Sequence, residues 1–468
     1  MLEGLEISEV KISDIDLGDR YDAEYFYKDD LNAVSLLASK NSQTLDNFGN
    51  FVASAFYPSA TELYAIGDIP FIRCVDCISF PFITTEQENL FERLPLNFIE
   101  EQKGINTLNK GDIVITKVGS PCHASIVEEY DFVALSRTVM GLKNIKAINP
   151  YYLLVFLRCK YGFNQLLRER ELTIQYQLTL DRVKNILIYE PSEKFQSAIE
   201  EFVKQQNEIN QASKILYSET LNILLQELGL SNWHPTIKNN NTKTLQESFL
   251  TSGRIDAEYY QPKYDELLQD LKQFNHDTLG NLVFIQKSIE PGSDAYQNDG
   301  IPFIRVANLS RNGISESDVF LSNDEFGDFP IMPKKDTILL SKDGSVGIAY
   351  KVEEDMKAIT SGAILHLTVN SKKVLPDYLT LVLNSVVVKL QSERDAGGSI
   401  IQHWKPDEIK QVIIPIVGEE IQKTISEKMQ KSFSLLNKSH QLLAVAKRAV
   451  EIAIEQNEKA ALNYLNNY

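Results

Sequence analysis

IPFIRCVDC at residues 69–77 and IPFIRVANL at residues 301–309 decide how this chain folds, because an identical pentapeptide occurs once in each half. A second pair lies upstream of these segments. An arginine followed by YDAEYF at residues 21–26 matches an arginine followed by IDAEYY at residues 255–260. Agreement at both places, in the same order, is the signature of an internal repeat, so the 468 residues consist of one module written twice.

Further matches extend the repeat along nearly the whole chain. GDIVITKVGS from Gly111 pairs with KDTILLSKDGS from Lys335, and PYYLLVFL from Pro150 pairs with PDYLTLVL from Pro376. Each half then ends in an apolar run, VKNILIYEP or IKQVIIPIV, followed by a long heptad-like segment. The order of the elements is therefore the same in both halves.

The local patterns predict a mixed α/β module. Short β-branched runs bounded by Gly, Pro and Asn are typical of strands. A helix is predicted over residues 151–167 and its partner over residues 377–391, each with a proline at the entry. In the second module, the glycine-containing loop AGGSIIQHW at residues 396–404 leads into the last strand.

Two long helices are predicted from apolar stripes, of which the first has steps of three, four or seven residues. The stripes consist of Phe195, Ile199, Phe202, Ile209, Leu216 and Ile223, and of Ile421, Ile425, Leu436, Leu443, Val450 and Ile454. A helix on the order of 50 Å long cannot bury such a stripe on one small domain. We therefore expect the two helices to pack antiparallel on each other, as a rigid spacer between the modules.

The predicted domain organisation follows from these elements. It is a first module over residues 1–192, a spacer helix over 193–229, a linker over 230–250, a second module over 251–417 and a second spacer helix over 418–463. The linker contains SNWHPTIKNNNTKT, which is rich in Asn, Thr and Pro.

Composition limits the function classes. The formal net charge of −17 argues against a protein that coats nucleic acid without regard to sequence, although a net charge averages over all faces. No stretch approaches the ~20 apolar residues of a membrane span. Glu3, Glu6 and Glu9 stand where a secretory leader carries positive charge. We expect a cytoplasmic protein without membrane contact.

The order of module, long helix, module and long helix resembles the specificity subunit of type I restriction-modification systems. The resemblance rests on this layout, the two IPFIR strands, the GDIVITKVGS and KDTILLSKDGS segments, and the strand-to-helix joins at residues 190–199 and 415–425. Many members carry PP-x-x-EQ at the join, whereas this chain reads YEPSEKFQ and VGEEIQ. That departure affects only where each helix begins.

The resemblance implies an α+β fold with two homologous mixed α/β target recognition domains, separated by two long antiparallel coiled-coil helices. Each domain would read one half of a split site in double-stranded DNA. The helices would hold the halves apart and dock two methyltransferase subunits and, where one exists, a restriction subunit. Adenine methylation and cleavage would belong to those partners, so this chain is expected to be non-catalytic and to bind no cofactor.

Two other functions stay open on the sequence. NPYY at residues 149–152 resembles the Asn-Pro-Pro-aromatic signature of adenine methyltransferases, which bind a flipped base. The second module reads LPDY at residues 375–378 and no glycine-rich cofactor loop lies upstream, so a plain helix entry is favoured over a stand-alone methyltransferase. No GxSxG or HExxH motif occurs. The acidic charge keeps a structural adaptor with duplicated protein-binding modules as the other alternative.

The cysteines suggest a metal site only in the first half. Cys74 and Cys77 form a CxxC, and Cys122 with His123 would complete a zinc shell. A metal site that the fold needs should recur, yet the second module has no such pair, so no metal is expected. Cys159 is the fourth cysteine, and reduced thiols are the simplest interpretation of all four.

The candidate DNA contacts lie on turns and loops. A strand that runs into a Gly-bearing turn with a lysine beside it can bring backbone amides and a cation to a phosphate, or it can be a plain turn. Base reading needs side chains with directional donors and acceptors. The predicted DNA-binding residues are Lys117, Gly119, Ser120, Arg137, Thr138, Gln175 and Tyr176 in the first module, and Lys342, Gly344, Ser345, Ser361, Gln402 and His403 in the second. Arg73 and Arg305 recur in both copies, which favours a role in the fold or a backbone contact over sequence choice.

Overall fold

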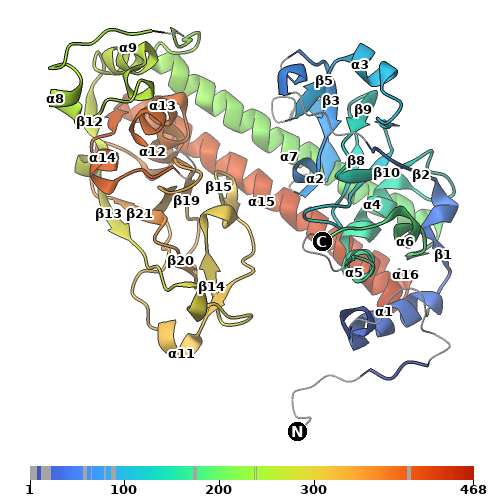
Figure 1. Cartoon of the computed structure of the whole chain (residues 1–468). Coiled ribbons are helices and arrows are strands. Elements are labelled where there is room, and N and C mark those ends of the chain that lie inside the picture. Colours follow the sequence, from blue (N-terminus) through green and yellow to red (C-terminus); the bar gives the residue numbers. More distant parts are fainter. Residues whose placement is uncertain are drawn as a thin grey trace. The chain divides into compact units, whose positions relative to one another are not determined.

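The computed structural model folds into two compact units, which consist of residues 1–209 with 438–468, and of residues 210–437 (Figure 1). The structure describes residues 8–11, 23–55, 61–64, 66–78, 81–85, 91–171, 176–236, 238, 240–397 and 402–468. The division runs through both long helices, whereas each helix was predicted to be a separate element between the domains.

Two sheets carry the strands of the first unit. The larger sheet has the order β2 (Asn50–Ala53), β10 (Val139–Lys143), β7 (Ile113–Thr116), β8 (Ala124–Val127) and β4 (Phe82–Ile83). The smaller sheet has the order β5 (Glu92–Leu94), β3 (Ile69–Ile72), β9 (Phe132–Leu135) and β6 (Thr107–Asn109). Strands β7 and β8 are buried along their whole length, because helices cover one face of the sheet and strands of the smaller sheet pack against the other.

The second unit repeats this arrangement. Its larger sheet has the order β13 (Val283–Lys287), β21 (Ile364–Val369), β18 (Ile338–Ser341) and β19 (Ala349–Lys351). Its smaller sheet has the order β17 (Phe320–Leu321), β14 (Ile301–Ile304) and β20 (Ile359–Thr360). Both IPFIR strands pair in parallel, β3 with β9 and β14 with β20. The predicted duplication of a mixed α/β module is confirmed.

Each module also contains a two-stranded antiparallel sheet. In the first unit β1 (Ser42–Thr44) pairs antiparallel with β11 (Leu187–Tyr189), and in the second β12 (His276–Thr278) pairs with β22 (Ile413–Pro415). The modules differ after the IPFIR strand. The first has helix α2 (Cys74–Ile78), whereas the second has the 3-10 helix η8 (Val306–Asn308), followed by a hairpin of β15 (Leu309–Ser310) and β16 (Gly313–Ile314).

The helix predicted over residues 151–167 is two helices, α4 (Pro150–Arg158) and α5 (Lys160–Arg168). The backbone between them is extended at Cys159, with φ −79° and ψ 168°. Gly162 permits the fold-back at this break, because a Cβ there would lie 2.1 Å from the carbonyl oxygen of Phe156. The prediction of one continuous helix is wrong.

The same correction applies to the second module, where residues 377–391 fall in α12 (Pro376–Leu383) and α13 (Val386–Asp395). Ser385 breaks the helix with an extended backbone, and its hydroxyl accepts a hydrogen bond from the Val387 N–H. Such a cap stabilises the start of a new helix, which explains the break.

Buried polar contacts recur at equivalent positions. The Tyr152 hydroxyl donates to the Tyr189 carbonyl oxygen at 2.7 Å, and the Tyr378 hydroxyl donates to the Pro415 carbonyl oxygen at the same distance. Each tyrosine is fully buried, so each bond satisfies a group that would be costly to leave unpaired.

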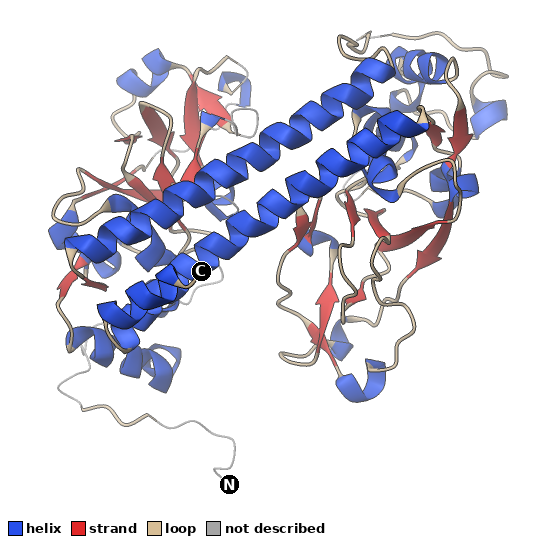
Figure 2. Ribbon diagram, turned by 180° about the vertical axis from the view of Figure 1, so that it is seen from behind, coloured by secondary structure: helices blue, strands red, loops and turns tan. Residues whose placement is uncertain are grey.

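The long helices are α7 (Glu193–Glu227) and α15 (Glu419–Glu455), whose halves pack side by side within each unit (Figure 2). They are antiparallel, because in the second unit Ser213 contacts Ser432 while Glu219 pairs with Lys428. The chain thus has two mixed α/β domains joined by antiparallel helices.

A break after α15 was not predicted. Helix α16 (Glu458–Asn466) begins as a separate helix, and the Asn457 side chain caps it by accepting a hydrogen bond from the Ala460 N–H.

The helix seam is more polar than the predicted stripe. Ile209, Leu216 and Ile223 are only half-buried, whereas Gln206 and Ser213 are buried. Gln206 donates to Ser439 at 2.7 Å in the first unit, and Ser213 donates to the Ser432 carbonyl oxygen at 2.7 Å in the second. Hydrogen bonds across the seam therefore replace part of the expected apolar packing.

Within the described part of the chain, no helix is both long enough and apolar enough to cross a membrane.

Candidate nucleic-acid interface

The first Gly-Ser turn (residues 117–121) connects β7 to β8 and is closed by the side chain of Thr116. The Thr116 hydroxyl donates to the Ser120 carbonyl oxygen at 2.8 Å and accepts from the His123 N–H at 2.9 Å. Gly119 has φ 92°, a conformation that L side chains rarely adopt. The turn exposes Gly119 and Ser120 to solvent.

The second Gly-Ser turn (residues 342–347) connects β18 to β19 and repeats this geometry. The Ser341 hydroxyl donates to the Ser345 carbonyl oxygen at 2.6 Å and accepts from the Ile348 N–H at 2.9 Å. Gly344 has φ 75° and is exposed, as is Ser345. The hydroxyl before each turn thus fixes the same backbone shape in both modules.

The backbone of the turn lysine joins three segments in each module. The Lys117 N–H donates to the Thr138 carbonyl oxygen at 3.0 Å, and the Lys117 carbonyl accepts from the Leu178 N–H at 2.8 Å. Lys342 makes the equivalent bonds, both 2.8 Å long, to Ala363 and Trp404. The turn, the loop after the parallel strand, and a return loop (residues 176–178 or 402–404) therefore meet at one place.

This junction brings most of the predicted DNA-binding residues together. Lys117, Arg137 and Tyr176 lie on its three segments in the first module, and Lys342, Gln402 and His403 lie there in the second. Arg137, Tyr176, Gln402 and His403 are all exposed. The predicted contact at Gln175 lies outside the described residues, as do Arg20, Tyr21 and Asp22 of the upstream repeat.

Two predicted residues, and the residue next to a third, are less available. Ser361 is 6% exposed, and its N–H donates to the Ile304 carbonyl oxygen as part of the sheet. The Thr138 hydroxyl accepts from the Cys74 N–H at 3.1 Å. Trp404, which follows His403, is 1% exposed and belongs to the core. These side chains support the junction from inside.

The electrostatics of the two junctions differ. Burial and then the charge of nearby Arg137 lower the pKa of Lys117, so two cations gather at the first turn. At the second turn Lys342 forms an ion pair with Asp343, and the Asp343 carboxylate lies 2.8 Å from Nδ1 of His403. Asp343 was not among the predicted contacts. Its position in the sequence, between the predicted contacts Lys342 and Gly344, could have identified it.

The NPYY tetrapeptide is a helix entry, as favoured. The Asn149 side-chain oxygen accepts from the N–H groups of Tyr151 and Tyr152 at 2.9 and 3.2 Å, which caps α4. Its amide nitrogen donates to Glu200 at 2.6 Å. These bonds occupy the amide that a flipped base would need.

The cysteines and the repeated arginines have structural surroundings. All four cysteines are buried and unbridged, and burial raises the pKa of Cys122 to about 12. Within the described residues, no cluster of three or more His, Cys, Asp or Glu side chains could hold a metal ion. Arg73 pairs with Asp76 at 3.3 Å, and Arg305 with Asp318, which agrees with a role in the fold.

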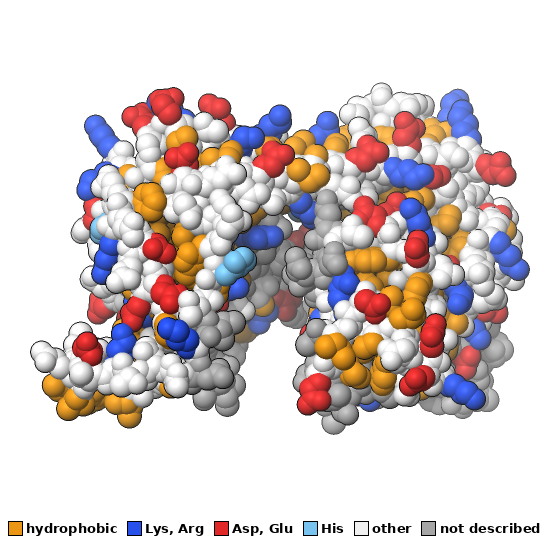
Figure 3. All heavy atoms as spheres, turned by 90° about the horizontal axis from the view of Figure 1, so that it is seen from above, with side chains coloured by type: hydrophobic (Ala, Val, Ile, Leu, Met, Phe, Trp, Pro, Cys, Tyr) orange, Lys and Arg blue, Asp and Glu red, His pale blue; other side chains and the backbone are white. Residues whose placement is uncertain are grey.

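Acidic and basic side chains are interspersed over the visible face of both units (Figure 3). This mixture fits the negative net charge and places no large single-sign area on that face.

One family model matches the chain. Residues 273–447 match the type I restriction modification DNA specificity domain. The matched stretch starts just before β12 and ends within α15, so it corresponds to the second module. No curated protein matches the chain.

Solved structures show weak overall likeness. The chain is similar to a type I restriction-modification system S subunit from M. genitalium, with 13% identity, 91% of this chain and 95% of that chain covered, and a TM-score of 0.35. It is also similar to an HsdS subunit from Thermoanaerobacter tengcongensis, with 15% identity, coverage of 77% and 80%, and a TM-score of 0.27. At TM-scores this low, neither likeness is evidence for function.

Proposed function

We infer that this chain is the DNA sequence-specificity subunit of a type I restriction-modification system. Residues 273–447 match the type I restriction modification DNA specificity domain. The strands of the two sheets in the second unit have counterparts in the same order in the first, and the two Gly-Ser turns share their geometry. A single chain therefore carries a pair of specificity modules.

The observation that carries the proposal is a constant backbone with different exposed side chains. The two junctions share the backbone hydrogen bonds of their lysines. Yet the exposed Tyr176 and Gln177 of the first module correspond to the exposed Gln402 and His403 of the second. The exposed Arg137 of the first module corresponds to Gly362, which is buried. Phosphate contacts position a protein on DNA, whereas base-edge contacts carry the sequence information. Constant turns suit the first task, and variable side chains suit the second.

The proposed target is a split DNA site with one half-site per module. In each module the turn amides and the lysine would contact a phosphate, and the exposed residues on the return loop would reach base edges. The long helices would set the number of base pairs between the half-sites. The residues named for these contacts are Lys117, Gly119, Ser120, Arg137 and Tyr176, and Lys342, Gly344, Ser345, Gln402 and His403.

The proposed partners are two methyltransferase subunits and, where one is present, a restriction subunit. Specificity subunits are non-catalytic, and NPYY serves α4 here. Adenine methylation and cleavage are accordingly assigned to those partners, which would act at the site that this chain selects.

Methylome sequencing tests the proposal. The host expresses the neighbouring methyltransferase with this chain or without it. We expect a split adenine motif that is methylated only when the chain is present. A motif that persists without the chain would contradict the proposal and favour the structural adaptor.

A further inference from the structure

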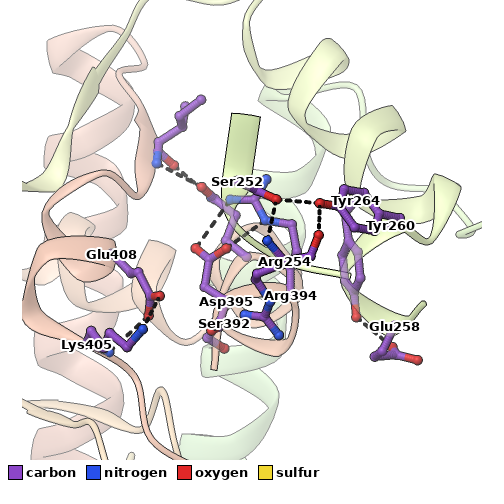
Figure 4. A network of polar contacts seen from close by, with 12 residues as sticks. Ser252, Arg254, Glu258, Tyr260, Tyr264, Ser392, Arg394, Asp395, Lys405 and Glu408 are labelled. Atoms are coloured by element: carbon purple, nitrogen blue, oxygen red, sulfur yellow. Dashed lines mark hydrogen bonds and ion pairs between the residues drawn. The ribbon is translucent and has the colours of Figure 1, made fainter. Parts of the chain in front are cut away.

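The repeated DAEY box (residues 21–26 and 255–260) takes no part in the proposed DNA contacts, yet in both modules its fifth residue, Tyr25 or Tyr259, lies against an arginine at a helix end. In the second module the Arg254 guanidinium donates to the Asp395 carbonyl oxygen at 2.9 Å, at the end of α13 (Figure 4). The guanidinium carbons of Arg254 and Arg394 lie 4.6 and 5.4 Å from the ring centre of Tyr259. The ring therefore attracts both cations and ties the box to the helix end.

The first module has the equivalent contact. Tyr25 corresponds to Tyr259, and Arg168 at the end of α5 corresponds to Arg394. The Arg168 guanidinium carbon lies 3.9 Å from the ring centre of Tyr25, and Nε donates to the Tyr25 carbonyl oxygen at 2.8 Å. The described part of the box forms a single 3-10 turn in each module, η2 (Ala23–Phe26) and η6 (Glu258–Tyr260).

Backbone hydrogen bonds join the residues that follow these helix ends to the return loops. In the second module Gly397 and His403 exchange backbone hydrogen bonds of 3.1 and 2.7 Å. In the first, the Glu171 N–H donates to the Gln177 carbonyl oxygen at 2.8 Å. Glu171 and Gly397, which make these bonds, each lie three residues after the arginine that stacks on the box.

In the first module a chain of side chains also links the box to the return loop. Arg170 pairs with Glu24 of the box at 3.6 Å, and its guanidinium carbon lies 4.2 Å from the ring centre of Tyr176. Tyr176 is 40% exposed and is one of the predicted DNA contacts. The box therefore reaches the candidate reading residue through one arginine.

We propose that Tyr25 with Arg168, and Tyr259 with Arg394, are positioning residues that hold the return loops in the orientation that reads DNA. The inference rests on the proposed function. Tyr25 and Tyr259 are only half-buried, so the pairs are not needed to fill a core. Their recurrence beside loops of different sequence points to a task that both modules share, which is the presentation of whatever side chains the loop carries.

The test uses the full chain assembled with its methyltransferase subunits. The variants are Tyr25→Leu and Tyr259→Leu, with Tyr25→Phe and Tyr259→Phe keeping the aromatic face. Phe284→Leu is a matched control, because Phe284 is a 60% exposed ring in the second module outside the box. Affinities are measured for duplexes with the motif found by methylome sequencing, and with either half-site scrambled.

We expect Tyr259→Leu to reduce discrimination against one scrambled half-site by about tenfold, and Tyr25→Leu to do so for the other half-site. Each should leave the opposite half-site within about twofold, as should both phenylalanine variants and the control. Equal weakening for all duplexes, with discrimination unchanged, would overturn the inference. A wild-type complex that discriminates against neither scrambled duplex would instead refute the proposed function.

Discussion

The two Gly-Ser turns have the same backbone and different charges. Thr116 and Ser341 close them with equivalent hydrogen bonds, but Lys117 has a second cation nearby, whereas Lys342 is paired with an aspartate. The duplicated part of each module is therefore its scaffold, and divergence is concentrated where side chains leave that scaffold. A protein that reads two different half-sites with one fold needs this separation.

Removing the anchors of the return loops should break both junctions and give the largest effect. Leu178 and Trp404 are buried equivalents, so we expect losses of about 2–5 kcal/mol for Leu178→Ala and about 3–5 kcal/mol for Trp404→Ala in the free energy of unfolding. Chemical denaturation measures these losses. Trp404→Phe is the control, because Trp404 Nε1 has no hydrogen-bond partner among the described residues. A loss below about 1 kcal/mol for either alanine variant would show that the loop is not anchored there.

Acid should destabilise the second unit through a buried histidine that the first module lacks. His366 is buried on β21, where the first module has Gly141, and burial lowers the pKa of His366 to about 4. An unfolded histidine titrates near 6.5, so the second unit keeps its full stability above that pH and loses on the order of 2–3 kcal/mol as the pH falls toward 4. Unfolding followed at several pH values should show this loss. His366→Leu should reduce it, and an unchanged pH dependence in that variant would contradict the assignment.

Removing the hydroxyl that closes each Gly-Ser turn should lower the stability of both modules by a similar amount. Thr116→Val and Ser341→Ala each remove a buried hydroxyl that serves a carbonyl and an N–H, which should cost about 1–3 kcal/mol of stability. Thr116→Ser keeps the hydroxyl and is the control. If only one module were destabilised, the shared closure of the turns would be wrong.

The salt dependence of DNA binding should give the smallest and most specific difference. Lys117→Ala should reduce the slope of log affinity against log salt by about 1, and Lys342→Ala by less, because Asp343 already neutralises that lysine. Asp343→Asn should raise the slope toward that of the first module. Equal slopes for the two alanine variants would show that the charges around the turns do not reach a phosphate.

Much of the fold could be predicted because each element proposed in one half of the chain could be checked against its counterpart in the other half. Strands at IPFIR and at the turn segments, and a long helix after each module, followed from β-branched runs and heptad spacing. The breaks at Cys159 and Ser385 could not be predicted, since they depend on a close approach at Gly162 and on a cap. The seam residues Gln206 and Ser213 were missed because an apolar pattern does not reveal hydrogen bonds between helices.

The candidate site could be predicted only in part. Lys117, Lys342 and their glycines were found from the repeated segments. That return loops meet these turns was not predictable, because backbone hydrogen bonds between residues about sixty apart leave no local pattern. Ser361 was named from its loop-like surroundings, but the parallel pairing of β14 and β20 buries it.

The most direct test of a shared scaffold that reads two different half-sites is a chain in which residues 20–191 are replaced by a copy of the corresponding residues 254–417. Methylome sequencing of a host that expresses this variant with the methyltransferase gives the result. We predict a split motif whose two half-sites have become inverted copies of one original half-site. Retention of both original half-sites would contradict the claim that each module reads one of them.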